Sequence, residues 1–344
     1  MTVINAIRFD DMSGAMVSDE ERTLDMKRTL CSIDKIKHII PERIQKEYGL
    51  TARFGTTGTC SVGSELKYGL LKDIDELYEK EIERLGRKPD KFKTLEDIAF
   101  MAFEKLLELK HKHVNEILTT RYGFDTKDLI RGYYMAGDEK IDIKDKEIIK
   151  AAEDIVTFTR RSTETDRIFI NLGIIAGLDE QKGFQIFHLS LLNHTCEPVQ
   201  SLFKSDGSGQ DVSNIDFIDY IRNKKLSEKR GRIDPVEGMI QTIEATLHCH
   251  KMNIGIGGYL EIVYFDGREK DHMKKMKQFD DNRSKLACEI VDAFSADLIS
   301  KDLTFKLIED LLFKEENFEK VHEAMMKKSP NQKKLKRYLR GYKV

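Results

Sequence analysis

The sequence predicts an α+β protein in which strands and helices pack in layers. β-like segments cluster at residues 3–59, 167–189 and 255–265, and helical periodicity fills the blocks between and after them. Strands grouped apart from helices in this way favour layered packing over a parallel sheet of alternating strands and helices. No linker rich in proline, glycine or serine divides the chain and no internal repeat is visible, so we expect one elaborated domain over residues 1–344.

The first expected elements are two strands joined by a tight turn. Residues 3–9 and 15–17 are short apolar runs, and the turn-rich sequence Asp-Asp-Met-Ser-Gly at 10–14 lies between them. Asp and Gly tolerate the backbone geometry of such a turn, so the pattern predicts a β-hairpin. Two further β-like segments follow at 33–40 and 50–59.

A helical block is expected over residues 61–165. Apolar residues recur there at helical spacing among charged ones, which predicts an amphipathic helix that ends before the Gly-Arg-Lys-Pro break at 86–89. The rest of the block is expected to contain helices over about 94–119 and 144–161 and a less regular stretch over 126–143.

The second half of the chain returns to strands and ends in helices. The β-branched run at 167–177 and the alternating run at 184–189 are separated by turn residues, which predicts a second hairpin. The remaining expected elements are helices near 211–226 and 234–251, a strand at 255–265, and C-terminal helices with a basic tail over 271–344.

Composition excludes several classes of function. Lysine plus arginine (58) nearly balances aspartate plus glutamate (60), so the molecule has no strong field to attract nucleic acid. The chain contains no apolar run of the ~18–20 residues that a membrane-spanning helix needs, and no secretory signal is visible. The five cysteines are an odd set without framework spacing, which suits reduced thiols. We therefore expect a soluble cytoplasmic protein without nucleic-acid or membrane partners.

No metal or cofactor is expected either. His248-Cys249-His250 contains residue types that bind metals, but helical positions two apart face different directions. No second Cys/His pair has a spacing that would complete a metal site. His111 and His113 fail for the same reason.

Several segments, in order, resemble the β-subunits of proteasomes and their bacterial and archaeal relatives, which are N-terminal-threonine (Ntn) hydrolases. The matching pieces are Thr2 on a short strand, Ser18-Asp19 at the end of the next strand, Lys35 before alternating apolar residues, and the glycine-rich turn at 55–59. Later pieces are the hairpin at 169–189, the Ser-Asp-Gly-Ser-Gly turn at 205–209 and the turn at 253–258. The resemblance implies a four-layer αββα sandwich, in which the block at 61–165 is an enlarged helical insertion.

The family's chemistry centres on the N-terminal threonine. Once Met1 is removed, the Thr2 hydroxyl is the nucleophile and its own α-amine, with a pKa of ~7.7–8.0, accepts the proton. The resemblance implies that Lys35 favours the deprotonated hydroxyl, that Asp19 holds Lys35, and that Ser208 supports the amine. The backbone N–H of Gly58 or Thr59 is implied as the oxyanion donor.

The same residues also have ordinary structural explanations, and other functions compete with the threonine hydrolase. Asp19 and Lys35 are also ordinary charges, Gly58 suits turn geometry, and the turn around Ser208 suits a plain loop. The family's Asp-x-x-Ser-Gly-Gly becomes Asn253-Ile254-Gly255-Ile256-Gly257-Gly258, which favours an inactive assembly or binding protein. The hypotheses are a threonine protease or amidohydrolase of peptide or protein substrates, a transpeptidase using the same acyl-enzyme, and that inactive homologue. Because the family packs into rings, a homo-oligomer is expected. The helical insertion either caps the site or mediates a different assembly.

Overall fold

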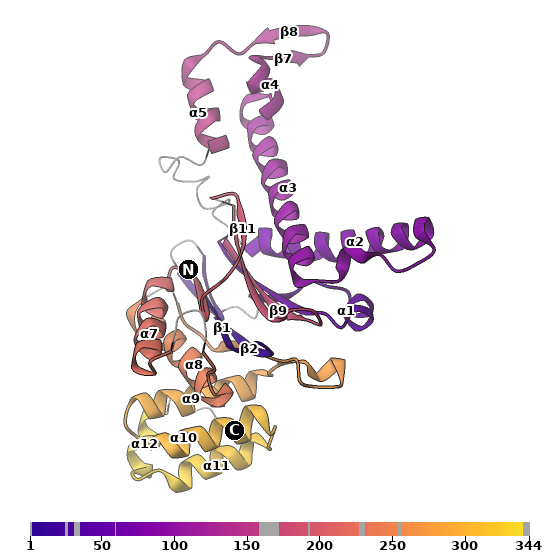
Figure 1. Ribbon diagram of the computed structural model, residues 1–344. Helices are drawn as coiled ribbons and strands as arrows, with labels where there is room; N and C mark the ends of the chain where they lie inside the picture. Colours follow the sequence, from indigo (N-terminus) through magenta and orange to yellow (C-terminus); the bar gives the residue numbers. More distant parts are fainter. Residues whose placement is uncertain are drawn as a thin grey trace.

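The computed structural model describes residues 2–24, 27–30, 35–58, 60–157, 172–191, 193–226, 231–253 and 256–339 (Figure 1). Within these ranges the strands form two five-stranded antiparallel sheets and two separate hairpins, with helices outside the sheets. The mixed α+β class expected from the sequence is confirmed.

The first sheet has the order β12-β1-β2-β13-β14. Its strands are β1 (Val3–Asp10), β2 (Ser13–Asp19), β12 (Phe203–Gly207), β13 (Leu260–Asp266) and β14 (Met276–Gln278). The β1–β2 pair is the hairpin that the turn residues predicted. Its neighbours place Val3 opposite Gly207 and Asp19 opposite Leu260, so four strand ends meet at one end of the sheet.

The second sheet has the order β11-β10-β9-β6-β5. Its strands are β5 (Ile36–His38), β6 (Thr51–Thr57), β9 (Leu172–Asp179), β10 (Gly183–Ser190) and β11 (Thr195–Pro198). β9 and β10 form the second predicted hairpin, of which residues 167–171 lie outside the described residues. The segment expected at 33–40 pairs only over β5.

The two sheets pack face to face through a shared apolar cluster. Its members are Ile4, Ala6, Met16, Ile36, Ile174, Ala176, Leu178, Phe184, Ile186, Val263 and Phe265. The sheets approach closely at Gly55, where a Cβ atom would lie 2.8 Å from Ile4 Cγ2. A larger residue there would force the sheets apart, so the glycine is needed for packing.

Helices of the first half cover the outer face of the second sheet. They are α1 (Glu42–Tyr48), α2 (Cys60–Leu85), the short η1 (Asp90–Phe92) and α3 (Leu95–Tyr122). A cluster that includes Phe54 and Phe187 of the sheet and Leu66 and Leu106 of the helices fills this interface.

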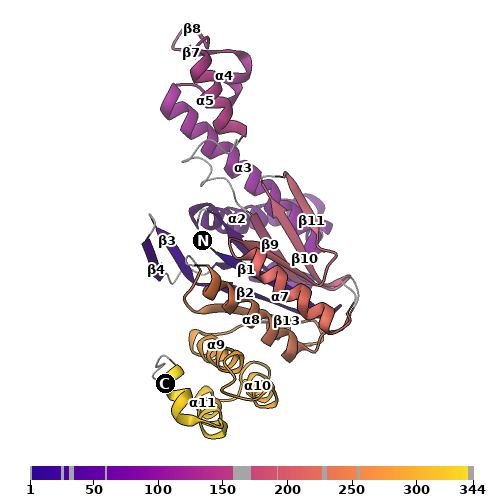
Figure 2. The ribbon, with the colours of Figure 1, turned by 90° about the vertical axis from the view of Figure 1, so that its left-hand side faces the viewer.

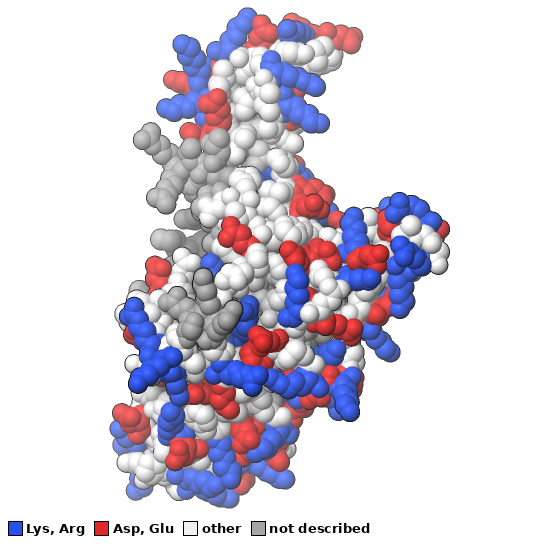
Figure 3. All heavy atoms as spheres, in the orientation of Figure 1, with Lys and Arg blue, Asp and Glu red and all other residues white. Residues whose placement is uncertain are grey.

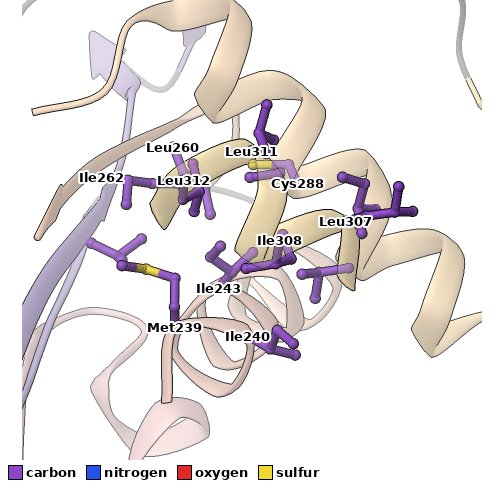
Figure 4. Close-up of a cluster of buried hydrophobic side chains, with 14 of the residues drawn as sticks. Met239, Ile240, Ile243, Leu260, Ile262, Cys288, Leu307, Ile308, Leu311 and Leu312 are labelled. Atoms are coloured by element: carbon purple, nitrogen blue, oxygen red, sulfur yellow. The ribbon is translucent and has the colours of Figure 1, made fainter. Parts of the chain in front are cut away.

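Helices of the second half cover the outer face of the first sheet. They are α7 (Gln210–Asn223), α8 (Pro235–Met252), α9 (Asp281–Ser295) and η3 (Glu309–Phe313). Helices α10 (Lys301–Ile308), α11 (Phe318–Lys328) and α12 (Gln332–Tyr338) lie farther out and pack on α8, α9 and one another. Figure 4 shows how their side chains meet: Ile262 of β13 and Leu312 of η3 lie side by side, and Met239 and Ile243 of α8 lie below them in this view. This is the larger of the apolar interfaces described.

An arm projects from the body of the molecule (Figures 1 and 2). It consists of the distal half of α3 and then α4 (Thr126–Arg131), β7 (Tyr133–Ala136), β8 (Glu139–Asp142) and α5 (Lys146–Thr157). Its members pack on one another through a separate cluster of Val114, Leu118, Phe124, Ala152 and Ile155. The arm therefore has a small core of its own.

The structure corrects the predicted elements in several places, which include strands β11 and β12 where no strand was expected. The helical block at 61–165 contains the β7–β8 hairpin, and its residues 158–165 lie outside the described residues. The C-terminal region at 271–344 is not purely helical, because β14 pairs with β13 after the short helix η2 (His272–Lys274). Helix α1 and the hairpin of β3 (Glu21–Leu24) with β4 (Lys27–Leu30) were not expected.

The surface agrees with the balanced composition. Positive and negative side chains are interspersed over the face shown in Figure 3. No helix within the described ranges is long and apolar enough to cross a membrane.

Candidate active site at the start of the first strand

The strand ends that carry the predicted residues meet at one end of the sandwich. Thr2 immediately precedes β1, Asp19 is the last residue of β2, and Ser208 follows β12. Since β1 lies between β2 and β12 in the sheet, the antiparallel register brings these three chain segments together. Lys35 precedes β5 of the facing sheet and reaches across to Asp19.

Asp19 and Lys35 form a buried ion pair. The Lys35 Nζ donates to Asp19 Oδ1 over 2.7 Å, with the Asp19 side chain fully buried and that of Lys35 only 8% exposed. The same Oδ1 accepts the backbone N–H of Val3 at 2.9 Å. One carboxylate oxygen therefore ties the ammonium of Lys35 to the first residue of β1, directly after Thr2. A buried charge is tolerated at such a place only because it is paired and hydrogen-bonded.

Thr2 is held by Ser208 on the other side. The Thr2 backbone N–H donates to Ser208 Oγ at 3.2 Å, and Ser208 Oγ donates to the Thr2 carbonyl oxygen at 3.4 Å. The turn before Ser208 depends on Gly207, which has a φ of +96°. A Cβ atom on Gly207 would lie 2.1 Å from the Thr2 carbonyl oxygen, so only glycine fits beside the backbone of Thr2.

Two backbone and amide contacts complete the surroundings. Gly257 N donates to Asp19 Oδ2 at 3.4 Å, and Asn253 Nδ2 donates to the Ser208 carbonyl oxygen at 3.1 Å. Ile256 is buried with Val3 and Cys249 in a small apolar cluster beneath the start of β1. Asn253, Ile256 and Gly257 belong to the turn in which the sequence departs from the proteasome-type pattern. The sequence marked Asn253 and Ile256 only as changes, and it did not indicate that Gly257 reaches Asp19.

Gly58 lies near this group of residues but makes no described contact with it. It is exposed, has a φ of +101° and lies between β6 and α2. The preceding Thr57 has its Cγ2 3.1 Å from where a Cβ on Gly207 would be, so the turn is beside the start of β1. The positive φ agrees with the plainer reading that Gly58 serves the turn. Thr59, the other candidate oxyanion donor, lies outside the described residues.

The histidine and cysteine pattern on α8 has other partners. His248 Nδ1 lies 2.9 Å from Asp216 Oδ2, and this hydrogen bond raises the pKa of the imidazole. Cys249 is buried against Ser213 and Gly209, and burial raises the pKa of its thiol. No group of three potential metal ligands was found in the part of the chain that the structure describes.

Comparisons with known proteins yield a structural match only. No protein-family description and no curated protein matches this chain. Among solved structures, the chain is similar to Anbu (ancestral beta-subunit) from Yersinia bercovieri, with 10% sequence identity, 80% of this chain and 86% of that chain covered, and a TM-score of 0.44. This similarity concerns the fold alone.

Proposed function

We propose that this protein is an N-terminal-threonine hydrolase that cleaves a peptide or amide bond through an acyl-enzyme on Thr2. The observation that carries the proposal is the buried Asp19–Lys35 pair, whose shared oxygen Oδ1 also binds the backbone of Val3. A buried ion pair is a poor way to gain stability, since apolar residues of similar volume often serve as well or better. Its position next to Thr2 gives it a chemical purpose, because a fixed ammonium there stabilises developing negative charge.

The proposed reaction uses only groups of this chain and water. Removal of Met1 frees the Thr2 α-amine, which takes the hydroxyl proton as Thr2 Oγ1 adds to the substrate carbonyl. Lys35, held by Asp19, stabilises the negative charge that develops around the hydroxyl oxygen. The protonated α-amine of Thr2 then gives that proton to the nitrogen of the scissile amide, and the C–N bond breaks. The substrate's amine leaves, and the tetrahedral intermediate becomes a Thr2 ester. Water then adds to the ester, releases the acid and restores the hydroxyl.

The finer description of the fold is part of the same proposal. The two sheets, with α2 and α3 on one side and α7 to α9 on the other, fit the four-layer αββα arrangement of Ntn hydrolases. The arm is then the distal part of the enlarged helical insertion. We also propose that the chain assembles as a homo-oligomer, as the sequence resemblance implies. Sedimentation velocity tests this point, and a single monomeric species over a wide range of concentration would contradict it.

An inactive assembly or binding protein is the second candidate, and the Asn253–Ile256 turn is the observation that favours it. Ile256 contributes a buried apolar side chain where the family's pattern has a serine, so it offers no hydroxyl to the Thr2 amine. A transpeptidase would share every step as far as the Thr2 ester. It is distinguished by whether an added amine competes with water for that ester.

The deciding experiment is an intact-mass measurement before and after treatment with a β-lactone probe for N-terminal threonine. Loss of Met1 and a single adduct that maps to Thr2 are expected. The control is Thr2→Ala, which is also small enough for Met1 removal but has no hydroxyl to acylate. Retention of Met1, or a free Thr2 that takes no adduct, would refute the hydrolase and leave the inactive candidate.

A further inference from the structure

A second polar site lies away from Thr2, where edge strands of the two sheets come together. A cavity of about 170 Å³ is lined by His38 of β5, Thr51 and Arg53 of β6, Glu42 and Gln45 of α1, and His272, Met273 and Met276 near β14. The segment with η2 and β14 is the orange hairpin below α1 in Figure 1. The space exceeds the ~30 Å³ that one water occupies in the liquid, so a small solute fits.

The wall of this cavity is rich in hydrogen-bond donors. Arg53 is buried and donates from Nη1 to His38 Nδ1 over 2.8 Å, which fixes that imidazole with its Nδ1 as acceptor. Gln45, also buried, directs its side-chain amide to the His38 ring and to the Ile40 carbonyl. Glu42 is the only carboxylate among the described lining residues, and it is exposed.

Two buried polar atoms of the lining residues have no hydrogen-bond partner among the described residues. They are the hydroxyl oxygen of Thr51, a residue only 1% exposed, and Nδ1 of His272. An orphaned buried polar group costs ~1–3 kcal/mol, so sites of this kind are ordinarily filled by water, an ion or a ligand. Both residues line the same cavity, which indicates a common occupant.

We propose that this cavity binds a small oxyanion, a phosphate or a carboxylate, between Arg53, His38, His272 and Thr51. A guanidinium beside two imidazoles and a hydroxyl is the donor set that recognises such oxygens. The site is independent of Thr2: it lies at the start of β6, whereas the residues around Thr2 lie beyond the other end of that strand. Its failure would leave the proposed hydrolase untouched.

Anion binding at this cavity is coupled to proton uptake. Burial, Arg53 and Lys67 lower the pKa of His38 to about 4. Burial, Lys275 and Lys46 lower the pKa of His272, against the opposing charges of Asp271 and Glu180. The exposed Glu42 also faces the cavity. Both histidines are therefore neutral at neutral pH while the cavity is free. A bound anion favours the charged form of His272 and raises its pKa, whereas His38 keeps accepting from Arg53 at Nδ1 and stays neutral, so affinity increases as the pH falls.

The test is a titration of the full-length protein with inorganic phosphate, and separately with succinate, followed by the imidazole NMR signals of His38 and His272. Saturable shifts of both signals are expected, with tighter binding at about pH 5.5 than at about pH 7.5. The His272 pKa should rise by about one unit or more in the presence of the bound anion. A response to phosphate but not succinate, or the reverse, identifies which oxyanion the site selects.

Variants supply the matched controls. Arg53→Gln is expected to weaken binding at least about tenfold, and His272→Gln to weaken it and reduce its pH dependence. Arg43→Gln removes an arginine of α1 that pairs with Asp75 and Glu79 outside the cavity, and it should bind as the parent protein does. Circular dichroism checks folding, and if Arg53→Gln unfolds, His272→Gln decides. Absence of saturable binding by either anion, or undiminished binding in the folded variants, would overturn the proposal.

Discussion

The Asp19 carboxylate pairs with the Lys35 ammonium and also accepts the backbone N–H of Val3, and a substitution can separate these two roles. Asp19→Asn keeps an oxygen that can accept the Val3 N–H but leaves the Lys35 ammonium buried without its counter-charge. Removing one partner of a buried pair costs about 3–5 kcal/mol, so we expect a loss of that order in the free energy of unfolding, measured with urea. We also expect labelling of Thr2 by the β-lactone to slow at least about a hundredfold.

A surface pair provides the control for Asp19. Asp75 accepts from Arg43 at 2.9 Å, and both side chains are nearly half exposed. Asp75→Asn should therefore change stability by about 1 kcal/mol or less and leave labelling unchanged. Equal effects of the two substitutions would mean that burial of the Asp19–Lys35 pair has no energetic consequence.

The glycine beside Thr2 gives a second prediction at the residue scale. Gly207→Ala places a methyl group against the Thr2 carbonyl and strains a backbone with a φ of +96°. We expect it to displace the start of β1, abolish labelling of Thr2 and lower the melting temperature. Gly137→Ala, in the turn between β7 and β8, is the control, because its φ is +65° and its Cβ meets open space. That variant should show only the cost of the left-handed conformation, ~1–2 kcal/mol.

At the scale of elements, Glu289 of helix α9 makes the stability of the folded protein depend on pH. This carboxyl is buried, its Oε1 has no hydrogen-bond partner among the described residues, and burial and then Asp292 raise its pKa to about 7. Because the folded state binds the proton more tightly than the unfolded state, stability falls as the pH rises from about 4.5 to 7 and then levels off. The loss is up to about 3 kcal/mol at 1.36 kcal/mol per pKa unit.

Glu289→Gln removes the titration while keeping the shape of the side chain. Its stability relative to the parent protein should grow across the same pH window, as measured by urea unfolding at intervals of pH. A difference between the two proteins that is constant with pH would show that Glu289 is not held neutral by its surroundings.

The elements that the sequence predicted are those with strong local patterns. Helices α2, α3, α7 and α8 carry long apolar periodicity, and the β1–β2 hairpin carries its own turn residues. Helix α1 has only seven residues, too few for a period to show, and the strands β7 and β8 are mostly exposed, so they lack apolar alternation. β14 is a three-residue strand that depends on its pairing with β13.

The candidate site likewise has residues that the sequence predicted and a contact that it did not. Thr2, Asp19 and Lys35 were predicted from the order and spacing that resemble the family's, and the structure brings them together with Ser208 around the start of β1. The contact between Gly257 and Asp19 joins residues 238 positions apart through a backbone N–H. Every residue type except proline has a backbone N–H, so no sequence pattern could have indicated this contact.

At the scale of the whole molecule, the arm is expected to open independently of the body. Helix α3 has 28 residues, about 42 Å at 1.5 Å per residue, and only its first half packs on the second sheet. Leu118→Ala, in the cluster of the arm, should speed amide hydrogen exchange over residues 114–157 and leave β1 and β9 protected. Each leucine-to-alanine change costs about 2–5 kcal/mol where it acts.

Leu106→Ala is the matched control, because it removes the same side chain from the same helix where it contacts the sheet. This variant should lower the global stability measured by urea and speed exchange in the slowest amides of β6 and β9. Faster exchange throughout the body in Leu118→Ala would show that arm and body unfold as one unit.

In the proposed hydrolase, the hydroxyl of Ser208 makes the onset of activity depend on the removal of Met1. While Met1 remains attached, the nitrogen of Thr2 is an amide that can only donate, so Ser208 Oγ accepts from it and turns its own hydrogen to the Thr2 carbonyl. Excision of Met1 gives that nitrogen a lone pair in its neutral form. The hydroxyl can then rotate and donate to it, so the polarity of the 3.2 Å contact reverses without movement of either heavy atom. A single aminopeptidase cut would thus convert a structural link into a proton relay, and the nascent chain would stay inert until it is trimmed.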